Sequence, residues 1–298
     1  MKQQKYLLNI GLGIVAGLAF IWFIMGTLFD EELTGYIGNY SSAFGILFTM
    51  LTPVLSLAIG SIASAFLFFM PPIGNQKRNL IYRILGALGF IAFTAFSIKE
   101  GIEYATFPCL KGQEDTYRVL AIVLVALIDI AILLFVKLAT KKVDAKKIIP
   151  TVLVIFLVIA AWLFVSEVIK HLASRPRPRN VLFDSTYSIS FRNWYEFRPF
   201  LCFKEGYKDC KSFISGHAFI AATTIGTLPL ILSLGKKSTT KTIISLVVSG
   251  VFTFLVAFSR VVAYAHYMSD VMGAIIVCCI SQAIIFNLIY YIYEKKKK

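Results

Sequence analysis

Charged residues are scarce in this chain of 298 residues: they make up 15% of it, hydrophobic residues make up 58%, and the mean hydropathy is +0.76. A soluble domain of this length needs far more polar surface than this composition supplies. The scarcity of charge therefore excludes a soluble protein and predicts one that lies in a membrane. The sequence also lacks a long internal repeat, a low-complexity linker and any stretch with the composition of a soluble domain.

Acidic residues are fewer than basic ones, 16 against 30, which gives a net charge of +14. In a soluble protein such an excess would suggest nucleic acid as a partner. Here most basic residues lie in the loops between apolar runs, so we interpret them as determinants of membrane topology. We expect no nucleic-acid partner.

Apolar runs that are long enough, or nearly so, to cross a bilayer as helices recur along the whole chain. They cover residues 6–29, 43–70, 80–98, 119–137, 148–169, 213–234, 243–258 and 271–293. We therefore predict an all-α fold, a polytopic transmembrane helical bundle of about eight spans. The first run is longer than a typical signal-peptide core, and no small-residue cleavage site precedes Asp30, so we expect it to remain as the first span.

Lysine and arginine cluster in every second connection and at both ends of the chain. By the positive-inside rule this predicts a multi-pass protein of the plasma membrane with cytoplasmic N- and C-termini. The outer loop, residues 171–212, breaks the rule because it carries eight basic residues, Arg175 among them. Long loops are translocated regardless of charge, which is one explanation. The alternative is an anionic ligand bound at the outer face.

Five cysteines are divided between the last apolar run and the predicted outer side. Cys278 and Cys279 lie inside the run, where thiols behave as small apolar groups. Cys202 and Cys210 could form a disulfide if the outer side is oxidising, and Cys109 is an alternative partner for either.

The chain has only three histidines, His171, His217 and His266, and all lie at or beside the predicted outer ends of spans. If residues 259–270 form a helix, His266 and Asp270 are four residues apart on one face. A carboxylate bonded to one ring nitrogen leaves the other nitrogen basic, as a histidine nucleophile or general base requires. The alternative is a polar pair that only caps a helix end.

Two further segments offer groups that bind an anion. After Lys170, two prolines end the helix, and the extended chain can return Arg177 toward Lys170 to bind phosphoryl oxygens. Ser215 and Gly216 begin the next span, where unpaired N–H groups and the helix dipole favour an anion. His217 could protonate a leaving oxygen. Taken singly, each segment is also typical of a linker or a plain helix start.

Together these segments resemble the three motifs of the type 2 phosphatidic acid phosphatase (PAP2) superfamily, which is related to bacterial acid phosphatases and vanadium haloperoxidases. The family's motifs are Lys, six residues, Arg-Pro; then Pro-Ser-Gly-His; then Ser-Arg, five residues, His, three residues, Asp. The matching residues here are Lys170 and Arg177-Pro178; Ile214-Ser215-Gly216-His217; and Ser259-Arg260, His266 and Asp270. Only Ile214 departs from the pattern, and the proline that it replaces supplies no hydrogen-bonding side chain.

The resemblance covers about residues 80–293 and implies a six-helix catalytic domain, residues 76–298, that includes the outer loop 171–212. Residues 1–75 would then form two additional N-terminal spans. We expect a site at the outer membrane face.

The resemblance also implies the role of each residue. His266 would attack phosphorus to give a phosphohistidine, Asp270 would orient it, and His217 would protonate the leaving group. The phosphoryl oxygens would be held by Lys170, Arg177, Ser215, Gly216 and Arg260. No metal or other cofactor is expected, because the cations that crowd the site would repel one, although His171, His217, His266 and Asp270 are conceivable ligands.

The implied activity is hydrolysis of a lipid phosphomonoester or pyrophosphate, such as an undecaprenyl pyrophosphate-like carrier, phosphatidylglycerophosphate or phosphatidate. The alternatives are a lipid phosphotransferase that uses the same histidine, a lipid A-type glycolipid phosphatase, and a transporter or inactive lipid-binding relative. The expected partners are a phosphorylated lipid and membrane lipids. Asp129 lies in the middle of the fourth run, where a charge is costly and marks either a functional group or a buried hydrogen bond.

Overall fold

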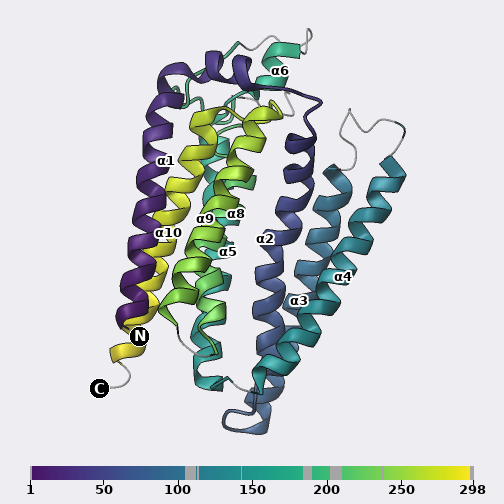
Figure 1. Ribbon diagram of the computed structural model, residues 1–298, viewed down its shortest axis with the longest axis vertical. Coiled ribbons are helices and arrows are strands. Elements are labelled where there is room, and N and C mark those ends of the chain that lie inside the picture. Colours follow the sequence, from purple (N-terminus) through teal and green to yellow (C-terminus); the bar gives the residue numbers. More distant parts are fainter. Residues whose placement is uncertain are drawn as a thin grey trace.

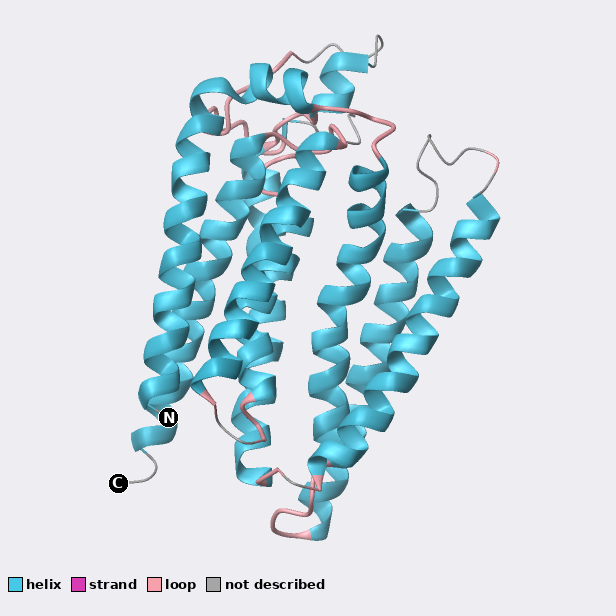
Figure 2. Cartoon of the chain, viewed as in Figure 1, coloured by secondary structure: helices cyan, strands magenta, loops and turns pink. Residues whose placement is uncertain are grey.

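The computed structural model describes residues 2–104, 112, 114–141, 143–183, 190–201, 210–235 and 238–295. Its helices are α1 (Lys2–Ile37), α2 (Ala43–Phe69), α3 (Gln76–Tyr104), α4 (Glu114–Thr140), α5 (Ala145–Ala173), α6 (Pro178–Phe183), α8 (Gly216–Leu232), α9 (Thr239–Val262) and α10 (Met268–Lys295). Within these ranges every regular element is a helix, as Figure 2 shows. The predicted all-α fold is confirmed.

Seven of the described helices are long and apolar enough to cross a membrane, and α8 is a shorter apolar helix of 17 residues. They coincide with the predicted apolar runs, but several continue further. For example, α1 continues through its acidic residues to Ile37, and α3 continues through Lys99 to Tyr104. The end of an apolar run marks where the hydrocarbon ends, whereas the backbone hydrogen bonds of the helix continue beyond it.

Large apolar side chains cover the outside of the bundle. Ile21 on α1, Leu127 on α4 and Val247 on α9 are each more than half exposed. An apolar surface of this extent is suited to lipid and not to water. This is a multi-pass membrane protein.

The helices pack as two neighbouring groups (Figure 1). In the larger group α1 packs along α10 and α8 packs along α9, with α5 against α8 and α10. This group encloses the main apolar core, in which Phe219, Ile225 and Met272 are fully buried. In the smaller group α3 and α4 pack on α2, which itself contacts α5, α8 and α9. Asp129 on α4 accepts a hydrogen bond of 2.5 Å from Thr94 on α3, so it ties these two helices together.

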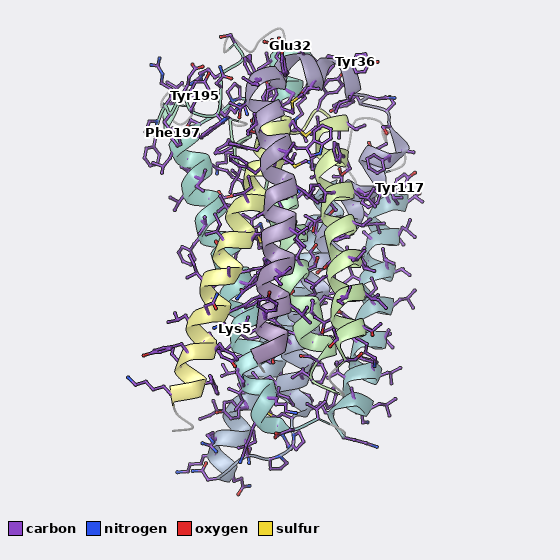
Figure 3. All side chains as sticks on the ribbon, turned by 60° about the vertical axis from the view of Figure 1, so that its left-hand side comes forward. Lys5, Glu32, Tyr36, Tyr117, Tyr195 and Phe197 are labelled. Carbon is purple, nitrogen blue, oxygen red and sulfur yellow. The ribbon has the colours of Figure 1, made fainter. Side chains whose placement is uncertain are left out.

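The N- and C-termini lie at one end of the bundle, and α6 lies at the other (Figure 1). Figure 3 shows the same separation in the side chains: Lys5 lies toward the terminal end, whereas Glu32, Tyr36 and Tyr195 lie at the opposite end. We call this opposite end the α6 end.

A kink at Phe29 (φ −137°, ψ 29°) bends α1 at the α6 end. The segment after the kink then runs across the end of the bundle (Figure 1). It is fixed to the turn between α9 and α10, because Asn39 N–H donates to the Val262 carbonyl over 2.8 Å and the Tyr264 hydroxyl donates to the Gly38 carbonyl over 3.1 Å. The N-terminal helix is therefore attached to the turn that contains His266.

The condition of a helix over residues 259–270 is not met, and the expectation for the chain after Lys170 was wrong in part. A break between residues 259 and 270 agrees with the separate spans predicted over residues 243–258 and 271–293. Residues 259–270 do not form one helix: α9 ends at Val262, Tyr264 adopts a left-handed backbone conformation (φ 52°), and α10 starts at Met268. The chain after Lys170 is extended only over residues 174–177, because the helix α6 starts at Pro178. Proline is well suited to the first position of a helix, where its missing N–H has no intrahelical partner to lose.

Candidate active site

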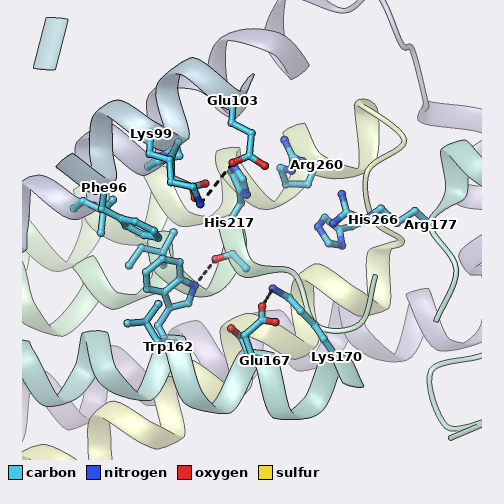
Figure 4. A pocket seen from close by; sticks show the side chains of 17 residues that line it. Phe96, Lys99, Glu103, Trp162, Glu167, Lys170, Arg177, His217, Arg260 and His266 are labelled. Carbon is cyan, nitrogen blue, oxygen red and sulfur yellow. Dashed lines mark hydrogen bonds and ion pairs between the residues drawn. The ribbon is translucent and has the colours of Figure 1, made fainter. Parts of the chain in front are cut away.

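A cavity of about 360 Å³ is lined by residues of α2, α3, α5, α8 and α9 and of the segments that follow α5 and α9 (Figure 4). Six of the predicted site residues line it: Lys170, Arg177, Gly216, His217, Arg260 and His266. These residues come from segments up to 96 positions apart in the chain, and the fold brings them together. The other two predicted residues, Ser215 and Asp270, are fully buried next to it.

Lys170 lies in the last turn of α5, which ends where Ser174 adopts a left-handed conformation and donates its N–H to the Lys170 carbonyl over 2.9 Å. The Lys170 ammonium pairs with Glu167, one turn earlier, over 2.6 Å. Glu167 also pairs with Lys211 over 3.4 Å. The shared carboxylate keeps the Lys170 side chain directed along the cavity wall.

The start of α8 lies against this lysine. Ser215 is the N-cap, and its hydroxyl accepts a hydrogen bond of 3.4 Å from Ala218 N–H. A Cβ atom on Gly216 would lie 3.3 Å from Lys170 Nζ, so glycine allows the ammonium to approach the helix start closely. Trp162 Nε1 donates to the Gly216 carbonyl over 3.0 Å and fixes this turn. A lysine beside the positive end of a helix dipole is a suitable site for an anion.

Arg260 lies in the last turn of α9 and is 1% exposed. Its guanidinium donates to the hydroxyl of Thr49 on α2, and that hydroxyl donates to the Gly45 carbonyl over 2.6 Å. His217, in the first turn of α8, is 7% exposed and lines the same cavity. Hence α2 helps to orient a cation that faces the anion site.

His266 lies in the turn between α9 and α10, with Nδ1 2.8 Å from the Ser212 carbonyl oxygen and 3.8 Å from Asp270 Oδ2. Because a carbonyl only accepts, Nδ1 carries the hydrogen, and Nε2 keeps its lone pair for the cavity. Burial, with the nearby charges of Arg177 and Arg260, lowers the pKa of His266 to about 3 against the opposing effect of Asp270. The imidazole is therefore neutral at physiological pH.

Asp270 lies in the first turn of α10 behind the imidazole. Its Oδ2 atom accepts hydrogen bonds from Ser212 Oγ over 2.5 Å and from Tyr267 N–H over 2.8 Å. Its Oδ1 atom pairs with Arg175 over 2.6 Å. Asp270 thus faces the imidazole as predicted, although the Ser212 carbonyl is the direct acceptor for Nδ1.

Four residues that hold the site carry no recognisable motif in the sequence and were not predicted: Asp30, Thr49, Arg175 and Ser212. Arg175 was counted only among the basic residues of the outer loop, and Asp30 only as a residue beyond the first span. Asp30 and Arg175 are 145 positions apart, so no local spacing marks them as a pair. The one available signal was that Arg175 lies between Lys170 and Arg177 in the first motif.

The remaining candidates lie elsewhere. His171 is not among the described residues that line the cavity, and its Nδ1 lies 2.7 Å from the Glu167 carbonyl oxygen. Cys278 and Cys279 are free and buried, as predicted. Cys210 is disulfide-bonded, and both Cys109 and Cys202 lie outside the described residues, so the predicted pairing of Cys202 with Cys210 stays a prediction. Within the described ranges, no three His, Cys, Asp or Glu side chains are arranged to hold a metal ion.

A membrane-embedded helical bundle with cations, a helix start and two histidines around one cavity has the arrangement of a membrane phosphatase. Residues 151–294 match the family described as the PAP2 superfamily, so the chain contains a PAP2 superfamily domain over this segment. The segment runs from α5 to α10 and includes all eight predicted catalytic and phosphate-binding residues. No curated protein and no solved structure matches the chain.

Proposed function

We propose that this protein is a metal-independent lipid phosphatase that acts through a phosphohistidine on His266. The observation that carries the proposal is the neutral imidazole of His266, whose Nε2 shares one cavity with the cations Lys170, Arg177 and Arg260. Phosphoryl transfer depends mainly on positioning and on stabilising charge at the phosphoryl oxygens, and these groups supply both.

In the first step His266 Nε2 forms a bond to phosphorus, the ester or pyrophosphate P–O bond breaks, and His217 gives a proton to the leaving oxygen. The ring of the phosphohistidine is positively charged, and Asp270 balances that charge through the Nδ1 side. In the second step water attacks phosphorus and gives a proton to His217, the P–N bond breaks, and inorganic phosphate leaves. Lys170, Arg177, Gly216 and Arg260 hold the phosphoryl oxygens in both steps, with Ser215 forming the helix start.

The apolar part of the cavity supports a lipid substrate. Its walls include Leu57 on α2, Phe96 on α3 and Leu163 on α5, and it lies where α3 and α5 both pack on α2. At the mouth, Lys99 pairs with Glu103 over 3.8 Å, and both side chains are more than half exposed (Figure 4). A lipid tail can remain in hydrocarbon while the phosphate reaches His266. Undecaprenyl pyrophosphate-like carriers, phosphatidylglycerophosphate and phosphatidate fit this arrangement.

We place both termini in the cytoplasm and the site at the extracytoplasmic face of the plasma membrane. The support is the positive-inside rule, applied to the basic connections at the terminal end of the bundle. Lys77, Arg78, Lys146 and Lys147 lie in or beside these connections. The division into two extra N-terminal spans, residues 1–75, and a catalytic domain, residues 76–298, is part of this proposal.

The test is phosphate release by the purified, detergent-solubilised protein in EDTA, with each candidate lipid and with a lipid A-type glycolipid. We expect release from one of them, reduced about 10³-fold or more in His266→Ala. The matched control is His171→Ala, which should keep activity within about 2-fold, because His171 lies outside the described cavity lining.

Equal activity in His266→Ala would refute the phosphohistidine, and loss of activity in EDTA would refute the metal-independent mechanism. Phosphoryl transfer to an added lipid or sugar alcohol, without release of phosphate, would instead identify a phosphotransferase at the same histidine.

A further inference from the structure

Three buried charged residues are linked by ion pairs that connect the site to the N-terminal helix. Asp270 pairs with Arg175 over 2.6 Å, and Arg175 pairs with Asp30 of α1 over 2.9 Å. None of the three is more than 2% exposed. Charged groups this deeply buried are retained only when they are paired and hydrogen-bonded.

Arg175 is held on every side. Its Nε atom donates to the Arg192 carbonyl over 2.7 Å, and one terminal nitrogen donates to both Asp270 and Ser269, the latter over 2.8 Å. The guanidinium lies 4.2 Å from the ring centre of Tyr267. A guanidinium with this many contacts has one orientation, so it fixes the carboxylate of Asp270 behind His266.

Asp30 also holds the start of α10. Its Oδ1 atom accepts the Ser269 N–H over 2.9 Å, and its Oδ2 atom accepts the Ser269 hydroxyl. Ser269 and Asp270 lie in the first turn of α10, where N–H groups have no intrahelical acceptor. Asp30 therefore serves as a capping group that comes from a different helix.

The charges of Asp270, Arg175 and Asp30 do not cancel. Two carboxylates and one guanidinium leave a net charge of −1 when all are ionised, next to the ring that becomes positive when Nε2 bonds phosphorus. In a buried site such a charge acts through a low dielectric and is felt strongly at the imidazole. Without Asp30 the charge of Arg175 would cancel that of Asp270.

We infer that Arg175 and Asp30 are positioning residues of the reaction: Arg175 fixes Asp270 behind His266, and Asp30 holds Arg175 and supplies the negative charge that stabilises the phosphohistidine ring. The inference rests on the proposed function. By this inference α1, which lies outside the matched PAP2 segment, contributes a positioning residue to the site.

The experiment compares kcat, KM and inhibition by inorganic phosphate in Asp30→Asn, Asp30→Glu and Arg175→Lys. We expect Asp30→Asn to lower kcat about 10-fold to 100-fold, the usual range for residues that orient a reacting group. KM and the phosphate inhibition constant should change less than about 2-fold, because the phosphate-binding cations are untouched. Asp30→Glu keeps the charge and should retain more activity than Asp30→Asn.

The matched control is Thr27→Val, one turn before Asp30 on α1. It removes the hydrogen bond that Thr27 accepts from Trp194 over 2.9 Å, without touching Arg175 or Asp270. A merely structural role of α1 predicts equal losses in Thr27→Val and Asp30→Asn, which would overturn the inference. Wild-type kcat in Asp30→Asn, or in Arg175→Lys if the first variant does not fold, would overturn it as well.

Orthovanadate binding separates this inference from the proposed function, because vanadate bonds to the ring nitrogen without any turnover. If the wild type hydrolyses no lipid, the proposed function fails. The inference then stands only if Asp30→Asn weakens vanadate binding about 10-fold while phosphate binding is unchanged. The inference is refuted if Asp30→Asn weakens vanadate binding and phosphate binding equally, or if it weakens neither of them.

Discussion

The two ring nitrogens of His266 have different surroundings, and this difference decides what the residue can do. Nδ1 faces a neutral acceptor, the Ser212 carbonyl, at 2.8 Å, and the carboxylate of Asp270 at 3.8 Å. A carbonyl fixes the tautomer without drawing the proton away, and the more distant carboxylate adds electrostatic stabilisation when the ring becomes charged. In the proposed reaction this arrangement suits the imidazole to act as a nucleophile and not as an acid.

The first prediction concerns the protonation of this ring. Because burial, together with Arg177 and Arg260, lowers the pKa of His266 to about 3, the neutral form predominates above that pH. Lowering the pH from about 8 to about 5 passes the pKa of an unperturbed histidine, near 6.5, and should still not protonate His266. Nitrogen-15 NMR of labelled histidines, assigned with His266→Ala, measures this directly. A midpoint between pH 6 and 7, or a hydrogen found on Nε2, would contradict it.

The second prediction concerns the glycine beside Lys170. In Gly216→Ala the new Cβ would lie 3.3 Å from Lys170 Nζ and should displace the ammonium by a few tenths of an ångström. A shift of a phosphate-binding cation should lower kcat/KM about 10-fold, because transition-state stabilisation is sensitive to such displacements. The control is Gly235→Ala after α8, where a Cβ meets no atom within 4 Å. Equal activity of the two variants would show that the close approach is not needed.

At the residue level the sequence was informative wherever a motif has fixed internal spacing. Lys170, Gly216, His217 and Arg260 were all found from such spacing and all line the cavity. Asp30 was not found, because it meets Arg175 only through the packing of distant helices. A contact of this kind depends on side-chain packing in three dimensions, and local sequence pattern carries no record of it.

At the level of helices, hydrophobic length predicts the spans well because the bilayer imposes it. Hydrophobic length does not predict the geometry of the turn and the kink that position the site residues. The turn between α9 and α10 joins the spans predicted over residues 243–258 and 271–293, and it places His266 so that Ser212 and Asp270 both face its Nδ1 atom. The kink at Phe29 similarly directs the end of α1 over α10. Neither break involves a proline or glycine. The end of one apolar run and the start of the next predict that the chain turns between α9 and α10, whereas no sequence signal marks the exact geometry of that turn or the kink at Phe29.

The third prediction tests the contact between α1 and α10. A Cβ on Gly26 would lie 2.5 Å from Ser269 N and 3.0 Å from Asp30 Oδ1, so Gly26→Ala should push α1 away from the start of α10. Because backbone atoms cannot yield as a flexible side chain does, we expect a loss of activity of about 10-fold or more. Gly13→Ala on the same helix, where a Cβ meets no atom within 4 Å, is the matched control.

Activity measured in lipid bilayers, together with the yield of folded protein, distinguishes the outcomes. A helix glycine replaced by alanine gains helix propensity, so Gly13→Ala should keep activity and stability. Gly26→Ala with wild-type activity would mean that α1 does not need to approach α10 closely.

At the scale of the whole molecule, the matched PAP2 segment does not include every group that holds the proposed catalytic residues. The segment begins within α5, yet Asp30 of α1 pairs with Arg175 and Thr49 of α2 bonds to Arg260. Both N-terminal helices also pack on helices of the segment, α1 on α10 and α2 on α8. The two helices that the sequence analysis treated as additional therefore contribute side chains to the surroundings of the site.

The last prediction concerns the orientation of the bundle in the membrane. The positive-inside rule places the terminal end in the cytoplasm, which would put the α6 end and the cavity outside. Tyr36 is 90% exposed at the α6 end (Figure 3), and Lys77 is exposed in the first turn of α3 at the other end. In intact cells a membrane-impermeant maleimide should label Tyr36→Cys, whereas Lys77→Cys should react only after permeabilisation. The unmodified chain, labelled in parallel, gives the background from its own five cysteines, which is subtracted from both variants. The reverse pattern would place the cavity in the cytoplasm, and the lipid substrate would then have to come from the inner leaflet.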